Sequence, residues 1–302
     1  MTKTTRTLPL ALKGVRILSL CLNVPGPAAL MRLRQMGARC VKLEPPAPAG
    51  APPGTSGDPM GYYNSAGFAA MHEGIRRVVA DLKTSIGQKT LHWELARCDV
   101  LLTSFRPSAM TKLGLSWKDL HRQYPALSQV AIVGAPGERA EEPGHDLTYL
   151  AEHGLVTDLS MPATLYADMG GSLMASEAVL KAVLLQRGAG RGHRLEVALS
   201  EAARYLALPR TWGLTLPEAA VGGAHAGYRL YACRDGRVAM AALEPHFARA
   251  LCNAAGVAFS GTTGMTEAAT HRAIARFLKG QTRAALEALA VEKDIPLHTL
   301  HA

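Results

Sequence analysis

Short apolar runs alternate with segments of helical periodicity up to about residue 200, and this alternation constrains the fold of the chain most strongly. The runs have the length of buried strands, and the segments between them are long enough to cross back over a sheet. The predicted strands are residues 15–20, 39–43, 78–82, 100–103, 127–133 and 194–199. The predicted helices are residues 27–36, 84–97, 108–113, 116–124 and 171–187. Because strands that alternate with helices form parallel sheets, we expect a doubly wound, mostly parallel, Rossmann-like α/β domain.

The pattern changes after residue 200, which predicts a second domain. Residues 228–233 and 238–243 are strand-like and flank an Asp-Gly turn, so they predict a β-hairpin. Helical segments follow at 245–255, 265–279 and 282–291. We expect a large α/β domain at 1–200, a linker at 201–227 and a smaller α+β domain at 228–302. Within the large domain, residues 45–58 are rich in proline, alanine and glycine and predict a loop.

The composition indicates a globular protein with an anionic ligand. Of the 302 residues, 48% are hydrophobic and 19% are charged, which excludes disorder as the main state. Lys and Arg number 33 against 24 Asp and Glu, so the net charge is +9. The basic residues are scattered along the sequence rather than gathered in one run. A polyanionic small molecule is therefore favoured over nucleic acid as the partner.

Several observations predict a cytoplasmic protein without metal or membrane contact. The five cysteines form neither a disulfide framework nor a CxxC pair, which favours a reducing compartment. The 11 histidines lack the spacing of metal ligands, so no metal site is expected. Lys13 and Arg16 interrupt the apolar run that starts at Leu8, which disfavours a secretory signal. No stretch approaches the roughly 18 apolar residues of a membrane span.

Two glycine-containing segments argue against ordinary NAD binding. Residues 188–192 follow a predicted helix and precede a predicted strand, the reverse of the order in a dinucleotide fingerprint. A flexible loop explains them better. The first strand-to-helix turn, at 23–27, contains one glycine and two prolines, so it cannot cradle a pyrophosphate in the usual glycine-rich way.

Basic residues beside two predicted strands are candidate phosphate ligands. Arg106 comes directly after the strand that ends at Thr103, and ligands of open α/β sheets collect at such strand ends. The planar guanidinium can hold a phosphate in two hydrogen bonds. Arg76 and Arg77 form a second basic pair next to a predicted strand. A solvated surface arginine is the alternative at each position.

Acidic and basic residues at predicted helix starts are candidates for proton transfer. His145 and Asp146 are adjacent and offer either a general base with a carboxylate or a helix cap. Asp168 stands before a predicted helix, as an N-cap or as a carboxylate beside free backbone N–H groups that suit an enolate-like charge. Glu244 also precedes a predicted helix, where an acidic residue favours the helix N-terminus.

Seven stretches carry a family resemblance in the order LKGVRILSL, PGPAALMRLRQMGARCVKLEPP, RRVVADLKTSIG, SFRPSAMTKLGLSWKDL, GHDLTYLAEHGLV, YADMGGSLMASEAVLKAVL and YRLYACRDGRVAMAALEPHF. Together they resemble the family III CoA-transferases of the CaiB/BaiF superfamily, and within it the α-methylacyl-CoA racemase branch. The resemblance covers nearly the whole chain. It implies a homodimer of the interlocked type that acts on acyl-CoA.

The residue before the active-site aspartate separates the two branches of this superfamily. It is usually tyrosine in the transferases, whereas His145 stands there in this chain and resembles the racemases. The resemblance implies that His145 and Asp168 are two bases on opposite faces of the substrate α-carbon, and that Glu244 orients His145 by a hydrogen bond. Asp146 would lie beside the thioester oxygen, with its backbone N–H as an oxyanion donor. The implied reaction inverts 2-methyl-branched acyl-CoA thioesters, a step of fatty acid metabolism.

The resemblance also implies how CoA is held. Arg106 would bind its phosphates, helped by Arg76, Arg77 and Lys42, and no cofactor is expected beyond the CoA of the substrate. Ser108 departs from the glycine that usually follows the Phe-Arg-Pro motif.

Two other functions stay open at the level of sequence. One is a family III CoA-transferase in which Asp146 forms a covalent aspartyl thioester with CoA. The other is a non-catalytic CoA-binding protein. The combination of His145, Asp168 and Glu244 favours the racemase over the transferase, whereas the non-catalytic protein would bind CoA without turnover.

Overall fold

The computed structural model describes residues 9–51 and 55–301 of the chain. Contacts divide it into a larger unit that ends at Ala207 and a smaller unit that begins at Leu208. Leu8, where the N-terminal apolar run starts, and residues 52–54 of the predicted loop lie outside the described residues. Among the helices that the structure describes, none combines the length and the apolar character needed to cross a membrane.

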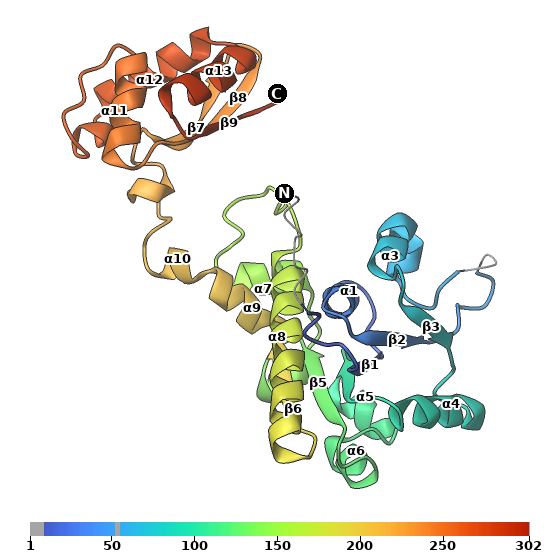
Figure 1. Cartoon of the computed structure of the whole chain (residues 1–302). Coiled ribbons are helices and arrows are strands. Elements are labelled where there is room, and N and C mark those ends of the chain that lie inside the picture. The colour runs from blue at the N-terminus through green and yellow to red at the C-terminus, as the bar shows by residue number, and fades with distance from the viewer. Residues whose placement is uncertain (1–8, 52–54, 302) are drawn as a thin grey trace, which may run out of the picture. The chain divides into compact units, whose positions relative to one another are not determined.

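Six parallel strands form the sheet of the larger unit (Figure 1). They are β1 (Arg16–Ser19), β2 (Arg39–Glu44), β3 (Arg76–Val79), β4 (Val100–Thr103), β5 (Ser128–Val133) and β6 (Arg194–Ala198). Their order in the sheet is β3-β2-β1-β4-β5-β6, and every neighbouring pair is parallel. This is the strand order of the doubly wound Rossmann-type sheet, so the predicted fold class is confirmed.

Helices connect these strands in the larger unit, and one more follows the last strand (Figure 1). They are α1 (Pro25–Gln35), α2 (Met60–Tyr63), α3 (Ser65–Met71), α4 (Ser85–Leu95), α5 (Pro107–Lys112), α6 (Trp117–Gln123), α7 (Asp146–Glu152), α8 (Tyr166–Ala189) and α9 (Leu199–Leu206). Pro25 and Pro27 open α1, where a missing backbone N–H and a fixed φ suit the first helical turn. Gly190 ends α8 in the left-handed conformation that glycine adopts without strain.

Alternate residues of the central strands pack into two separate cores. Ile17 and Leu102 pack with residues of α1 and α8, whereas Leu18 and Leu101 pack with residues of α4, α5 and α6. Successive side chains of a strand point to opposite faces, so the two cores cover the two faces of the sheet. Burial on both faces explains why these strands are nearly continuous apolar runs in the sequence.

The smaller unit is built around a three-stranded antiparallel sheet. It contains β7 (Tyr228–Cys233), β8 (Gly236–Ala241) and β9 (Leu297–Leu300) in that order, with helices α10 (Leu208–Thr211), α11 (Pro245–Ala254), α12 (Ala268–Gly280) and α13 (Arg283–Lys293). Val238 and Met240 of β8 pack with Leu251 of α11 and Leu278 of α12 in its core. The predicted hairpin and the α+β character are confirmed.

Some boundaries differ from the sequence-based expectation. Strand β3 begins at Arg76, two residues before the predicted start, because its bounds follow the pairing with residues 41–44 of β2 rather than its apolar residues. It is the edge strand, so polar side chains are tolerated on it. Helix α8 begins at Tyr166, which places Asp168 in its first turn rather than in front of it.

The short helices α2, α3 and α10 were absent from the prediction, and so were two elements that affect the domain boundaries and the second sheet. Helix α9 overlaps the predicted linker at 201–227 and packs against α8, so its segment belongs to the larger unit. Strand β9 is four residues long and pairs with β8 across more than fifty intervening residues. Its formation depends on that distant partner, which a local pattern does not reveal.

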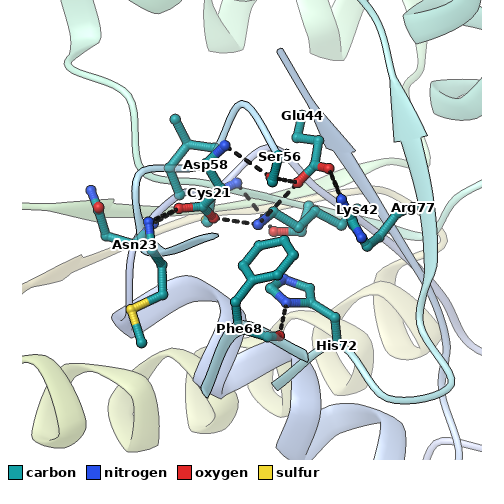
Figure 2. Close-up of polar contacts among 12 residues, drawn as sticks. Cys21, Asn23, Lys42, Glu44, Ser56, Asp58, Phe68, His72 and Arg77 are labelled. Atoms are coloured by element: carbon teal, nitrogen blue, oxygen red, sulfur yellow. Dashed lines mark hydrogen bonds and ion pairs between the residues drawn. The ribbon is translucent and has the colours of Figure 1, made fainter. Parts of the chain in front are cut away.

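A buried network of charges joins β2 to the loop before α2 (Figure 2). The ammonium of Lys42 forms ion pairs with Asp58 and, at 3.5 Å, with Glu44, and none of the three side chains is exposed. Arg77 donates to Glu44 Oε1 at 2.6 Å, and Ser56 donates to Glu44 Oε2 at 2.9 Å. Two positive and two negative side chains therefore balance, as burial of charge requires.

Asp58 extends this network to the first strand-to-helix turn. Its Oδ1 accepts the backbone N–H groups of Asn23 at 2.9 Å and Met60 at 3.0 Å (Figure 2). The aromatic ring of Phe68 lies 4.9 Å from the Lys42 ammonium and provides a further favourable contact. Lys42 thus fixes Asp58, and Asp58 fixes the turn that follows β1.

We expect Lys42→Met to lower the free energy of unfolding by about 3–5 kcal/mol, because the variant leaves buried carboxylates without their central cation. Urea unfolding at pH 7 measures this loss. Lys42→Met/Asp58→Asn should recover part of it, since removal of both charges restores the balance.

Lys181→Met is the matched control for this experiment. Lys181 forms an exposed ion pair with Glu177 one helical turn away in α8, and exposed pairs contribute about 0–1 kcal/mol. Equal losses in Lys42→Met and Lys181→Met would contradict a stabilising role of the buried network.

Candidate active site

A cavity of about 200 Å³ lies at the carboxyl ends of the strands, in the larger unit. It sits between the segments that follow β1 and β4, which is the topological switch point of the sheet. Its lining includes Asn23 after β1, Arg106 after β4, Gly134 after β5, and His145, Tyr149 and Asp168 from the region of α7 and α8. Ligands of open α/β sheets bind at such a crevice.

The turn after β1 is held in place by side chains rather than by glycines. Asn23 has a φ of +63°, a left-handed conformation that is uncommon for residues other than glycine. Asp58 accepts its backbone N–H, and the hydroxyl of Tyr63 donates to its side-chain oxygen at 2.8 Å. At Gly26, a Cβ would lie 2.0 Å from the Cβ of Cys21, so only glycine fits there. The wall of the cavity next to β1 is therefore rigid before any ligand arrives.

Arg106 ends the segment after β4 and is exposed at the cavity, immediately before α5. Ser108 donates its backbone N–H and its hydroxyl to the two carboxylate oxygens of Glu141, each at 2.7 Å. These hydrogen bonds, together with the nearby positive charge of Arg106, hold the pKa of Glu141 below its usual value. Ser108, which replaces the usual glycine, thus anchors the loop that carries Arg106.

His145 precedes α7 as its N-cap residue and lines the cavity with an exposed side chain. The hydroxyl of Thr148 accepts the backbone N–H of His145 at 3.1 Å and donates to its carbonyl at 2.7 Å. Before it, Gly144 allows the phenol of Tyr149 to approach closely, because a Cβ there would lie 2.5 Å from the Tyr149 oxygen. The backbone of His145 is fixed, whereas its imidazole faces the cavity.

Asp146 joins the starts of the two helices that carry the candidate bases. It is the first residue of α7, its side chain is buried, and its Oδ1 accepts the backbone N–H of Asp168 at 2.9 Å. This hydrogen bond satisfies one of the free N–H groups in the first turn of α8. Asp146 therefore places Asp168 relative to His145.

The environment of Asp168 suits a proton acceptor near neutral pH. Burial raises the pKa of its carboxyl from the usual 3.8 to about 6, and the neighbouring charge of Asp146 acts in the same direction. A carboxyl with such a pKa is ionised at neutral pH and is a stronger base than an ordinary aspartate. The cavity thus brings a carboxylate base, an imidazole and a guanidinium together.

The structure separates the other predicted CoA ligands from this cavity. Arg76 pairs with Glu94 at 2.5 Å, and Arg77 pairs with Glu44 on the opposite face of β3. Lys42 differs from the expectation, because its ammonium is fully enclosed by its carboxylate partners and is not available to a phosphate. None of these three residues is part of the cavity lining that the described residues form.

Glu244 lies in the smaller unit, where it is the N-cap residue of α11. Its hydrogen bond to His145 stays a prediction.

Tyr149 and Asn23 of the cavity, and Asp58, which supports Asn23, were not predicted from the sequence. Tyr149 lies one helical turn after His145, a spacing that places both on the same side of α7. Asn23 stands in the turn that was considered only for its glycine content. Asp58 lies in the loop rich in proline, alanine and glycine, and nothing in its local pattern indicates that it reaches both Lys42 and the turn at Asn23.

The sheet order and the cavity at the switch point define a doubly wound α/β protein with a ligand site at the carboxyl edge of its sheet. The sequence matches CoA-transferase family III over residues 12–302, and the chain belongs to that family.

Relatives with two different activities are similar to this chain. It is 30% identical over 266 residues to human alpha-methylacyl-CoA racemase, and this alignment covers 82% of the chain and 65% of the relative. It is 28% identical over 204 residues to cinnamoyl-CoA:phenyllactate CoA-transferase of Clostridium sporogenes, and this alignment covers 64% of the chain and 50% of the relative. The chain thus spans half to two thirds of the length of these two relatives.

A solved structure shares the fold. The crystal structure of a hypothetical protein from Mycobacterium tuberculosis matches with a TM-score of 0.81 at 23% identity, and the match covers 96% of this chain and 84% of that one.

The raised pKa of Asp168 has a consequence for stability. A carboxyl with a raised pKa favours folding below its unfolded-state pKa, and this contribution is lost as the pH rises through about 6. We therefore expect Asp168→Asn to be more stable than the wild type at pH 7 by about 1–2 kcal/mol, with partial solvent screening taken into account. The difference should vanish below about pH 4. Urea unfolding of both proteins between pH 4 and pH 8 measures it.

Asp158→Asn provides a control of opposite sign. The backbone N–H of Ser160 donates to Asp158 and lowers the pKa of its carboxyl, so this variant should gain no stability at neutral pH. A parallel gain in both variants would trace the effect to net charge rather than to the site.

Proposed function

We propose that the protein is an enzyme that acts on acyl-CoA thioesters and inverts the configuration of their α-carbon. The substrate class is 2-methyl-branched acyl-CoA. The observation that carries the proposal is the partly buried carboxyl of Asp168, with its pKa raised to about 6, in one cavity with His145 and Arg106. The 30% identity to a human relative named as an alpha-methylacyl-CoA racemase supports it.

Inversion requires a proton to leave one face of the α-carbon and another to arrive on the opposite face. In the proposed reaction, either Asp168 or His145 accepts the α-proton, and the other residue, in its protonated form, donates a proton to the opposite face. The electron pair of the broken C–H bond moves into the thioester group as an enolate. The backbone N–H of Asp146 lies in the first turn of α7, where such groups lack helical acceptors, and it would stabilise the enolate oxygen.

Arg106 binds the phosphates of CoA in this proposal. It lines the cavity at the carboxyl end of β4 and is exposed to solvent. Its guanidinium can offer two parallel hydrogen bonds to a phosphate. The CoA of the substrate is the only CoA that the reaction needs, and no other cofactor takes part. Orientation of His145 by Glu244, assembly as a homodimer and a cytoplasmic location belong to the same proposal.

The state of Asp146 favours the racemase over a CoA-transferase that uses it as a nucleophile. Its carboxyl group is buried and accepts the N–H of Asp168, whereas a nucleophile must reach the thioester carbon. Because one relative is named as a CoA-transferase, transfer of CoA between carboxylic acids is the other outcome of the test.

Exchange of the α-hydrogen tests the reaction directly. A single enantiomer of 2-methylacyl-CoA in heavy water should gain deuterium and lose optical purity together. Retained hydrogen, with transfer of CoA to a carboxylic acid and a trapped thioester on Asp146, would instead establish the transferase.

We expect His145→Ala and Asp168→Asn each to slow inversion by at least about 100-fold, because each removes one of the two proton-transfer groups. In the direction in which Asp168 accepts the α-proton, the rate in the wild type should rise as the pH increases through about 6, where Asp168 becomes ionised. The measurement is the rate of inversion, which is monitored by chiral separation of the thioesters.

His153→Ala and Asp158→Asn are the matched controls, since both residues lie outside the cavity lining. Inversion at wild-type rate in either His145→Ala or Asp168→Asn would refute the two-base reaction.

Arg106→Ala should weaken CoA binding by about 10- to 100-fold, because a charge-assisted hydrogen bond contributes about 1.5–3 kcal/mol. Calorimetric titration with CoA measures the affinity. Arg122→Ala, which removes an exposed arginine paired with Asp119, should leave it unchanged. An unaltered affinity in Arg106→Ala would remove Arg106 from the CoA site.

A further inference from the structure

Five arginines line a second cleft, of about 420 Å³, at the opposite edge of the sheet in the larger unit. They are Arg16, Arg34, Arg39, Arg76 and Arg97. The cleft lies at the amino ends of β1, β2 and β3, whereas the candidate active site lies at the carboxyl ends. Among the residues that the structure describes, the linings of the cleft and of the candidate active site do not overlap.

The topology of the sheet gathers these arginines. Arg16, Arg39 and Arg76 are the first residues of β1, β2 and β3, which are neighbouring parallel strands, so they begin at one edge. Arg34 lies in the last turn of α1, and Arg97 follows the end of α4. Helices that connect parallel strands return to the amino edge, so their last residues meet the first residues of the strands there.

Most of the positive charge in the cleft is not neutralised. Glu94 pairs with Arg76, and Asp99, at the border of the cleft, accepts the backbone N–H of Arg16 at 2.8 Å. The guanidinium of Arg97 donates to the carbonyl of Trp93 at 3.0 Å, and that of Arg16 donates to a carbonyl at 3.5 Å.

Arg34 and Arg39 carry the excess charge most clearly. Both are exposed, and neither side chain forms an ion pair or a hydrogen bond within the described part of the chain. Five guanidinium groups therefore face two carboxylates. Like charges gathered in a concave site repel one another and attract a polyanion from solution.

The chemistry of the lining narrows the class of anion. Guanidinium groups are planar forks that bind phosphate oxygens in pairs. The volume falls in the range of small-molecule sites, so a compact ligand fits better than a polymer. Trp93 adds an indole that is 53% exposed, and Arg97 stacks 3.5 Å from the centre of that ring. Such an aromatic and guanidinium surface suits a flat base.

We propose that this cleft binds a nucleotide, with its phosphates on Arg34 and Arg39 and its base against Trp93. The proposal does not depend on the proposed racemase reaction, because the two sites lie at opposite edges of the sheet. The ligand chemistry has two possible sources, a free nucleotide or the nucleotide portion of a CoA molecule.

Calorimetric titration in 150 mM NaCl tests the proposal, with ATP, inorganic triphosphate and CoA as separate probes. The proteins are the wild type, Arg34→Gln/Arg39→Gln, Arg106→Ala and Arg187→Gln. Arg187 is an exposed arginine of α8 outside both cavities, and its variant controls for net charge. Far-UV circular dichroism and urea unfolding verify that each variant folds, which is expected because the side chains of Arg34 and Arg39 form no hydrogen bond or ion pair with residues 9–51 and 55–301.

We expect ATP to bind the wild type more tightly than triphosphate does, since only ATP offers a base to Trp93. Arg34→Gln/Arg39→Gln should weaken ATP binding by at least about 10-fold, since two charge-assisted contacts are removed. Arg106→Ala and Arg187→Gln should leave ATP binding within about twofold of the wild type.

The CoA titration identifies the source of the ligand. If Arg106→Ala alone weakens CoA binding, the cleft serves a free nucleotide. If the double variant also weakens it, the cleft takes the nucleotide portion of CoA.

Three results would overturn the proposal. They are no ATP binding by the wild type, equal weakening in Arg34→Gln/Arg39→Gln and Arg187→Gln, and ATP binding no tighter than that of triphosphate. The first two results would mean that the cleft is not a specific anion site. The third would mean that Trp93 does not bind the nucleobase, so the ligand is not a nucleotide. None of them bears on α-hydrogen exchange at the other edge of the sheet.

Discussion

The ion pair between Lys42 and Asp58 is the interaction on which the carboxyl edge of the sheet depends. A buried ammonium is tolerated only with a partner, so the loop before α2 must return to β2 and deliver the carboxylate of Asp58. The same carboxylate holds the backbone of Asn23 in an unfavourable left-handed conformation. The need to pair the buried charge of Lys42 therefore also fixes the backbone that forms one wall of the candidate active site.

The order of strands and helices could be predicted because burial on both faces of the sheet leaves a clear apolar pattern. Strand β4 was predicted with both of its boundaries, and it is fully buried. Strand β3 was displaced by two residues, because it lies at the edge and two of its four residues are arginines. Strand β9 could not be predicted, since it exists only through its pairing with β8. The local sequence pattern therefore predicts central strands well, but it does not predict edge strands that form by pairing with distant residues.

The candidate site divides along a similar line. His145, Asp168 and Arg106 were selected from the sequence because they stand next to strand ends and helix starts, and the structure gathers them around one cavity. Lys42 was selected through the family resemblance as a helper of Arg106, but its burial is a property of the tertiary fold. The basic residues were judged scattered because they are far apart along the chain, yet five arginines meet at one edge. Separation in sequence says little about separation in a sheet whose strands return to the same edge.

The central position of β1 has a consequence for the way the protein folds. Its backbone reaches a partner 83 residues further along the chain, where Arg16 bonds to Asp99. Contacts so distant in sequence slow folding, because the intervening chain must be ordered before they form. During synthesis, β1 and β2 can pair early, but the crevice between β1 and β4 closes only after β4 has left the ribosome. The crevice thus forms after the pairing of β1 with β2 and before β5 and β6 complete the sheet, and errors in that step would yield a compact chain without a candidate site.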